Sequence, residues 1–196
     1  MRRGFMPSRA SDLRCRPGPG HIPPTCWLPS TTAARLRDQR IRHHHSYWLT
    51  LPGSLTRALQ LRCRRSFHVD VLAEGFRVPT PEERHTLGLV DRQLAWVREV
   101  QLCGDGEPWV MARTVIPATT LQGRGRRLRH LGRKPLGAYL FSRPEWQRGE
   151  FQAGLCRAER GPGQAAIARR SRFSCGPHHL LVGEYFLPAL LNQTGT

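Results

Sequence analysis

Two stretches of this chain alternate like half-buried β-strands, and each holds one charge on its apolar face. Over residues 94–102, the face that holds Arg98 is otherwise apolar, with Leu94, Trp96, Val100 and Leu102. Over residues 180–186, Glu184 shares a face with Leu180, Val182 and Phe186. Successive side chains of a strand point to opposite faces, so both charges are directed into an apolar layer. An unpaired buried charge costs roughly several kcal/mol, so each of these side chains needs a partner.

That need can be met in two ways. Arg98 and Glu184 can pair with each other as a structural ion pair, or they can line a pocket for a small, polar, anionic ligand. The alternation alone leaves both arrangements open.

The rest of the chain predicts an α+β domain built on a single antiparallel β-sheet with inserted helices. Ser54 is a good N-cap for a helix over residues 55–61. The short turn at 103–108 joins the strand at 94–102 to one at 109–116 as a hairpin. The other expected elements are a strand at 67–78 that breaks near Gly75, a loop at 79–84, a helical stretch from 119 or 120 to 131, a turn and short helix at 135–141, and strands at 151–156, 169–175 and 180–187.

The chain is strongly basic, with a formal net charge of +17 over 196 residues. Its length suits one domain with a real core. No nucleic-acid-binding motif accompanies the charge, so we expect no nucleic-acid partner. Nine arginines and only two acidic residues fall within residues 1–44, which are also rich in proline and glycine. This composition predicts a disordered basic tail over 1–44 and a folded domain over 45–196.

The six cysteines are scattered without a CxxC pair, which indicates reduced thiols in a cytoplasmic protein. The histidine run at 43–45 has no cysteine or acidic ligand at a useful spacing, so no metal site is expected. No apolar run approaches the ~20 residues of a membrane span. The basic N-terminus has no apolar segment like that of a secretory signal. With no sign of an exposed apolar interface, a monomer is expected.

Familiar catalytic motifs such as GxGxxG, GxSxG and HExxH are absent from the sequence. Another set of motifs follows in order along the chain: WVREV (96–100), CGDGEPW (103–109), ARTVIP (112–117), LGRKPLG (131–137), YLF (139–141), RRSR (169–172) and EYFLP (184–188). On these motifs, the chain resembles the chorismate pyruvate-lyase family from about Trp48 to Pro188. These bacterial enzymes make 4-hydroxybenzoate for ubiquinone.

The resemblance implies a cofactor-free elimination, in which chorismate loses its enolpyruvyl side chain as pyruvate and its ring becomes 4-hydroxybenzoate. It also implies a single antiparallel sheet with helical flaps that enclose the ligand. The family's ligand-contacting positions match Arg98, Leu136 and Glu184. A fourth position, methionine in the family, falls on Leu55 when Ser-Leu-Thr-Arg is aligned with Ser-Met-Thr-Lys.

The chemistry of these side chains suits such a substrate. An arginine on an apolar face offers a planar fork to a carboxylate, and backbone N–H groups at Leu55 and Leu136 could share that carboxylate. Glu184 could accept a hydrogen bond from the C4 hydroxyl or act as a base towards the C4 proton. An intramolecular pericyclic route would need only shape and polarity from the protein.

The sequence holds other arginines whose roles it does not settle. Arg113 also falls on an apolar face, and we expect it to be a buried structural partner of a glutamate. Arg169, Arg170 and Arg172 could attract a dianionic substrate or lie on a solvated face. The alternative to an enzyme is a non-catalytic, effector-sensing module of the same fold.

Overall fold

The computed structural model of the protein describes residues 22–29, 43–156 and 167–193, and its described part is built on one sheet. Seven strands lie in the order β1-β5-β6-β7-β4-β3-β2, and every neighbouring pair is antiparallel. The strands are β1 (Thr25–Pro29), β2 (Phe67–Arg77), β3 (Ala95–Gly104), β4 (Glu107–Pro117), β5 (Gln147–Cys156), β6 (Ile167–Cys175) and β7 (His178–Phe186). The expected single antiparallel sheet with inserted helices is confirmed.

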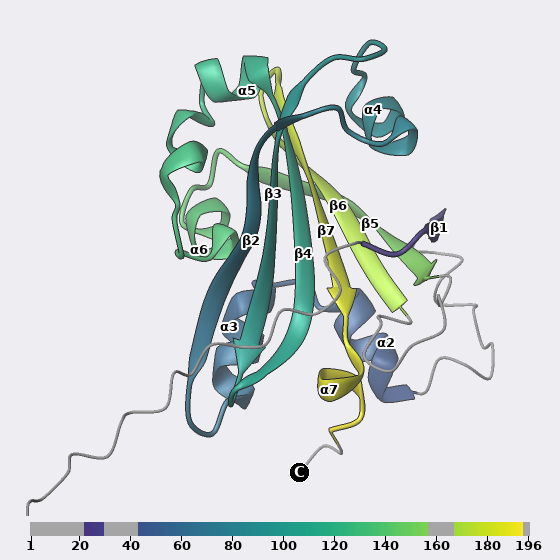
Figure 1. Ribbon diagram of the computed structural model, residues 1–196, viewed down its shortest axis with the longest axis vertical. Helices are drawn as coiled ribbons and strands as arrows, with labels where there is room; N and C mark the ends of the chain where they lie inside the picture. The colour runs from purple at the N-terminus through teal and green to yellow at the C-terminus, as the bar shows by residue number, and fades with distance from the viewer. Residues whose placement is uncertain (1–21, 30–42, 157–166, 194–196) are drawn as a thin grey trace, which may run out of the picture.

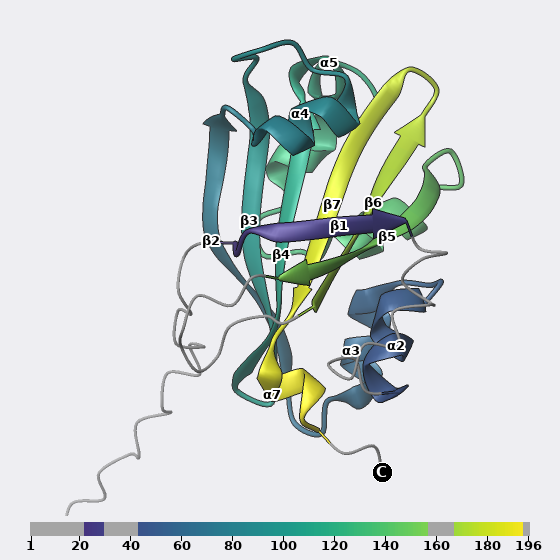
Figure 2. The same cartoon turned by 90° about the vertical axis from the view of Figure 1, so that its right-hand side faces the viewer.

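Helices cover both faces of the sheet (Figure 1). They are α2 (His43–Thr50), α3 (Leu55–Arg62), α4 (Pro81–Leu87), α5 (Ala118–Gln122), the 3₁₀ helix η1 (Arg126–His130), α6 (Leu136–Phe141) and α7 (Pro188–Leu191). On one face, α2, α3 and α7 cover one apolar cluster, and α5, η1 and α6 cover a second. Helix α4 and strand β1 lie over the other face (Figure 2).

The β3–β4 hairpin is closed by a tight turn at Asp105 and Gly106. Both residues have positive φ, 54° and 92°, a region that favours Gly and tolerates Asp. The Asp105 carboxylate accepts hydrogen bonds from the backbone N–H groups of Arg64, Arg65 and Ser66, at 2.7–3.2 Å. These bonds hold the pKa of Asp105 below its usual value. The turn therefore fixes the loop that leads into β2.

Local capping explains one wrong expectation. Residues 79–84 were expected to be a loop, but α4 begins at Pro81. The Thr80 side chain accepts a hydrogen bond from the Glu83 backbone N–H, and the Glu83 carboxylate accepts one from the Thr80 backbone N–H. This capping box, with proline in the first turn, is a helix-start signal that outweighs the turn-like composition.

The helical stretch expected up to residue 131 is divided in two. Helix α5 ends at Gln122, and η1 begins at Arg126. Gly123 and Gly125 lie between the two helices. They explain the break, because glycine destabilises a helix interior.

The expected tail over residues 1–44 is wrong in part. Residues 25–29 form β1, which pairs with β5, and α2 begins at His43. The Trp27 indole donates to Glu82 and packs edge-on against Tyr185. The five residues of β1, which stand among prolines, are too few to show the alternation of apolar and polar residues that marks a strand. Only their contacts in the folded protein identify them as a strand. Residues 1–21 and 30–42 lie outside the described residues.

Two further features concern the described residues alone. None of the five cysteines that they include forms a disulfide. None of their helices is long and apolar enough to cross a membrane.

Candidate active site

A cavity lies on the helix-covered face of the sheet, between the two apolar clusters. The space between its lining atoms, counted together with the part that is open to solvent, is about 550 Å³. Its lining is mostly apolar and includes three charged side chains, those of Arg98, Arg148 and Glu184. The remaining lining residues are Leu55, Thr56, Val69, Val100, Leu102, Ala112, Thr114, Pro135, Leu136, Gly137, Leu140, Phe141, Phe173 and Val182. An apolar hollow with a few polar groups is typical of small-molecule sites.

Arg98 projects from β3 into this cavity, and both of its Nη atoms are hydrogen-bonded to other residues of the protein. Its Nη1 lies 3.0 Å from a carboxylate oxygen of Glu74, its neighbour on β2. Its Nη2 donates to the backbone carbonyls of Gly132 (2.7 Å) and Lys134 (3.4 Å). Among the described residues, none accepts from the Nε–H. The guanidinium is therefore fixed in place and keeps a donor for a ligand.

Glu184 projects from β7 into the same cavity, and its partner is not Arg98. One carboxylate oxygen, Oε2, lies 2.5 Å from Nε of Arg169, directly opposite on β6. Arg169 is fully buried and also donates to the carbonyls of Trp48 and Leu51, 2.9 Å away. No described residue donates to the second oxygen, Oε1. Glu184 thus has a compensated charge and a hydrogen-bond acceptor available to a ligand.

Strand β4 separates the two charges and explains why they do not pair. Arg98 lies opposite Thr114 on β4, whereas Glu184 lies opposite Ala112 on the other edge of the same strand. Two strand spacings and an offset of two residues place their Cα atoms about 12 Å apart. The cavity floor between them is the short side chains of Ala112 and Thr114. This arrangement leaves space for a small ring with a polar group at each end.

Leu55 and Leu136 also line the cavity, each as the first residue of a helix. The first backbone N–H groups of a helix have no acceptor within the helix. The two helix starts lie close together. A Cβ atom placed on Gly137 would be only 3.2 Å from the Ser54 hydroxyl and 3.3 Å from the Thr56 hydroxyl. The four residues singled out in the sequence therefore surround one cavity.

Arg148 is a cavity residue that the sequence analysis missed. It lies on β5, and its guanidinium is within 4.7–5.0 Å of the ring centroids of Phe141, Phe151 and Phe173. In sequence it stands in the polar stretch Gln-Arg-Gly-Glu, without an apolar alternation to mark it. Only the pairing of β5 with β6 brings it to the cavity.

The other arginines discussed above have different surroundings. Arg113, expected to be a structural partner of glutamate, is bonded to Glu83 and Glu99 on the opposite face of the sheet, which confirms the expectation. These carboxylates raise the Arg113 pKa above its ordinary value although burial opposes them. Arg169 and Arg170 are buried, so they do not form a solvated face.

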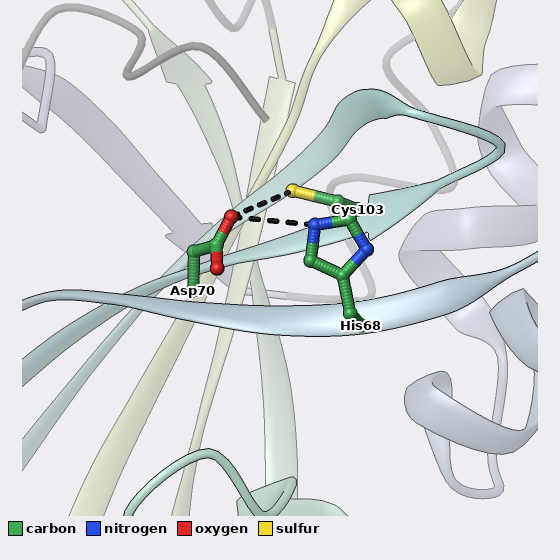
Figure 3. A group of neighbouring side chains, drawn as sticks. All are labelled: His68, Asp70 and Cys103. Atoms are coloured by element: carbon green, nitrogen blue, oxygen red, sulfur yellow. Dashed lines mark hydrogen bonds and ion pairs between the residues drawn. The ribbon is translucent and has the colours of Figure 1, made fainter. Parts of the chain in front are cut away.

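One group of described side chains has donors suited to a metal ion (Figure 3). The ligand atoms of His68, Asp70 and Cys103 all lie within 4.8 Å of one another. A nitrogen, an oxygen and a sulfur form a donor set that suits zinc. Asp70 also pairs with Arg133, at 2.7 Å. His68 and Asp70 alternate with the cavity residue Val69, so they point away from the cavity.

The charged and apolar side chains that line the cavity suit a small anionic ligand. Arg98 supplies positive charge at one side, Glu184 supplies an acceptor at the other, and apolar side chains enclose the space between them. Charge-assisted hydrogen bonds are strong in such surroundings.

Comparisons with known proteins identify the family of this chain. Residues 26–196 match the chorismate lyase family. The chain is 62% identical over 169 residues to a protein of Marinobacter nauticus named "Probable chorismate pyruvate-lyase", covering 86% of this chain and 89% of that protein. It is 38% identical over 147 residues to the "Chorismate pyruvate-lyase" of Pectobacterium atrosepticum, covering 74% and 77%.

Among solved structures, the effector domain of PhnF from Mycobacterium smegmatis is similar, with a TM-score of 0.49 and 16% identity, over 70% of this chain and 90% of that one. The family match begins at Cys26, within β1, so it starts well before Trp48, where the sequence motifs placed the start of the resemblance. Because the match spans most of the sequence, this chain belongs to the chorismate lyase family.

Proposed function

We propose that this protein is a chorismate pyruvate-lyase, which converts chorismate to 4-hydroxybenzoate and pyruvate. In this reaction the bond between C3 and the ether oxygen breaks and C4 loses its proton. The ring becomes aromatic, and the departing enolpyruvate gains a proton at its methylene carbon. The observation that carries the proposal is that Arg98 and Glu184 face one cavity from either side of a floor of short side chains.

In this proposal the ring carboxylate binds at Arg98 and at the backbone N–H groups of Leu55 and Leu136. The Nε–H of Arg98 has no acceptor among the described residues, and both leucines begin a helix. The C4 hydroxyl lies across the ring from that carboxylate, so it reaches Oε1 of Glu184. From that position Glu184 either takes the C4 proton or orients the ring for an intramolecular elimination.

The test is incubation of the purified protein with chorismate. We expect 4-hydroxybenzoate and pyruvate in equal amounts, the first measured by chromatography and the second by NADH oxidation with lactate dehydrogenase. No added cofactor is needed, since the products balance the substrate. Binding of chorismate without product formation would instead identify the effector-sensing module of the same fold.

The proposal includes a cytoplasmic monomer that supplies 4-hydroxybenzoate for ubiquinone biosynthesis, as the family resemblance implies. Light scattering after gel filtration tests the oligomeric state against the chain mass of 22.3 kDa. A mass of twice that value would contradict the monomer and leave the reaction assignment unaffected.

A further inference from the structure

The arginines of this chain differ in how the protein fills the two edges of their guanidinium groups. Arg113 is saturated: Glu83 takes the edge formed by Nε and Nη2, at 2.7 and 3.0 Å, and Glu99 takes Nη1 at 2.6 Å. The Nε/Nη2 edge is the fork that binds a carboxylate through two parallel hydrogen bonds.

Arg148 has this same fork empty. Its Nη1 donates to the carbonyls of Pro52 and Gly53, at 3.2 Å each. Its Nε is buried and has no hydrogen-bond partner, and no described residue accepts from its Nη2. No carboxylate of the described residues forms an ion pair with it.

The surroundings of Arg148 favour an anion at that fork. Two carbonyls and three aromatic rings are neutral partners that orient the cation. The nearby Glu184 carboxylate favours the Arg148 cation, but it is already paired with Arg169. A buried charge without a counter-charge is costly. Burial lowers the pKa of the Arg148 guanidinium to about 10, so it remains a cation at neutral pH.

Arg148 also lies where a second carboxylate of the substrate would be. It projects from β5 and Arg98 from β3, with β6, β7 and β4 between them, so their backbones are about 19 Å apart by strand spacing. Both side chains line the one cavity, from its two sides, and Glu184 lies between them on β7. Chorismate carries matching groups: a ring carboxylate on C1, a hydroxyl on C4 across the ring, and a second carboxylate on the enolpyruvyl ether of C3, next to that hydroxyl.

We propose that Arg148 forms a second anion subsite in this cavity, which binds the enolpyruvyl carboxylate of the substrate. This inference rests on the proposed function and extends it. The subsite distinguishes the dianionic substrate from the product 4-hydroxybenzoate, which has only one carboxylate.

The test compares ligands with one and two carboxylates in the variants Arg148→Gln and Arg148→Lys. For Arg148→Gln we expect the KM for chorismate to rise about 10- to 150-fold, as for the loss of a hydrogen bond to a charged group. Binding of 4-hydroxybenzoate, measured by calorimetry, should change less than about threefold because the product never reaches the fork. Arg148→Lys keeps the charge and should recover part of the loss.

Two controls make the outcome decisive. The stable dianion 3-(carboxymethoxy)-4-hydroxybenzoate measures binding without turnover and should lose affinity as chorismate does. Arg170→Gln, which removes a buried arginine on the opposite face, should leave both ligands unaffected. If Arg148 only supports the loop before α3, the one- and two-carboxylate ligands lose affinity together, and the subsite is refuted. A wild-type protein that binds the dianion but does not convert chorismate refutes the proposed function instead.

Discussion

Arg98 and Glu184 differ in how much of their hydrogen-bonding capacity the protein itself uses. Arg98 has one carboxylate and two carbonyls as partners, whereas Glu184 shares only one of its oxygens with Arg169. Removing either side chain therefore has effects on stability as well as on ligand binding. Each variant needs a matched control that breaks an ion pair elsewhere.

Arg98→Ala should weaken binding of both chorismate and 4-hydroxybenzoate. It removes a desolvated partner of the ring carboxylate, which both ligands carry, and the loss should be about 2–5 kcal/mol. Calorimetry with the product and steady-state kinetics with the substrate measure it. Glu74→Gln is the control, since it disrupts the Arg98 ion pair and keeps the guanidinium. Wild-type affinity in a folded Arg98→Ala protein would exclude Arg98 as the anchor.

Glu184→Gln should lower kcat more than it weakens binding of 4-hydroxybenzoate. The amide oxygen can still accept from Arg169 while the amide nitrogen donates to the hydroxyl oxygen, but the amide cannot take a proton. A loss of about 10²–10⁴ in kcat identifies a general base, and a smaller loss identifies an orienting role. Unchanged kcat would remove Glu184 from the mechanism.

The matched control for Glu184→Gln is Glu83→Gln, which weakens the Arg113 pair on the other face. Both variants disturb a buried pair and should melt at lower temperature. Only Glu184→Gln should reduce the kcat of the folded enzyme.

At the scale of elements, the β3–β4 turn makes stability depend on pH. The pKa of Asp105 is lowered in the folded protein, first by the backbone N–H of Arg64 and then by that of Arg65. The ionised Asp105 carboxylate therefore stabilises the folded protein fully at pH values above its unfolded pKa, about 3.9. That contribution is lost as the pH falls through the lower folded value.

Asp105→Asn should accordingly lower Tm at pH 7, and the gap to the wild type should narrow as the medium becomes acidic. Asparagine tolerates the same positive φ, so the turn itself is kept. Thermal melts across an acid-to-neutral pH series measure the effect. Asp91→Asn is the control, because Asp91 is exposed and its ion pair with Arg84 lies at the surface. A gap that stays constant with pH would contradict this account of the turn.

The elements also show what the sequence can and cannot predict. The alternation at 94–102 and 180–186 marked Arg98 and Glu184, because strands with one buried face keep a strict period of two. It could not show that β4 lies between them, since strand order depends on pairings that are distant in sequence. Arg148 and the strand at 25–29 were missed for the same reason: neither has a local pattern, and each is identified only by its neighbours in the folded sheet.

At the scale of the whole molecule, β1 closes one edge of the sheet. Removing residues 1–29 deletes β1 and exposes the edge of β5. It also removes the contacts that Trp27 makes with Glu82 and Tyr185. The lost burial of one large side chain should lower Tm by about 3–12 °C. Removing only residues 1–21 should leave both Tm and lyase activity unchanged, because their composition is that of a basic tail. Equal melting temperatures for the two truncated proteins would contradict a stabilising role for β1.

The charges that face the cavity also determine how the strands can pair. A slip of one residue in β7 would turn Glu184 to the opposite face, away from Arg169 and towards the layer that holds Arg113 and its two carboxylates. A slip in β3 would likewise separate Arg98 from Glu74 and leave both uncompensated. Each misaligned sheet would bury unpaired charges, which are far more costly than mismatched apolar contacts. The residues that we propose to bind the ligand therefore also fix the register of the strands, so the same charges serve both purposes.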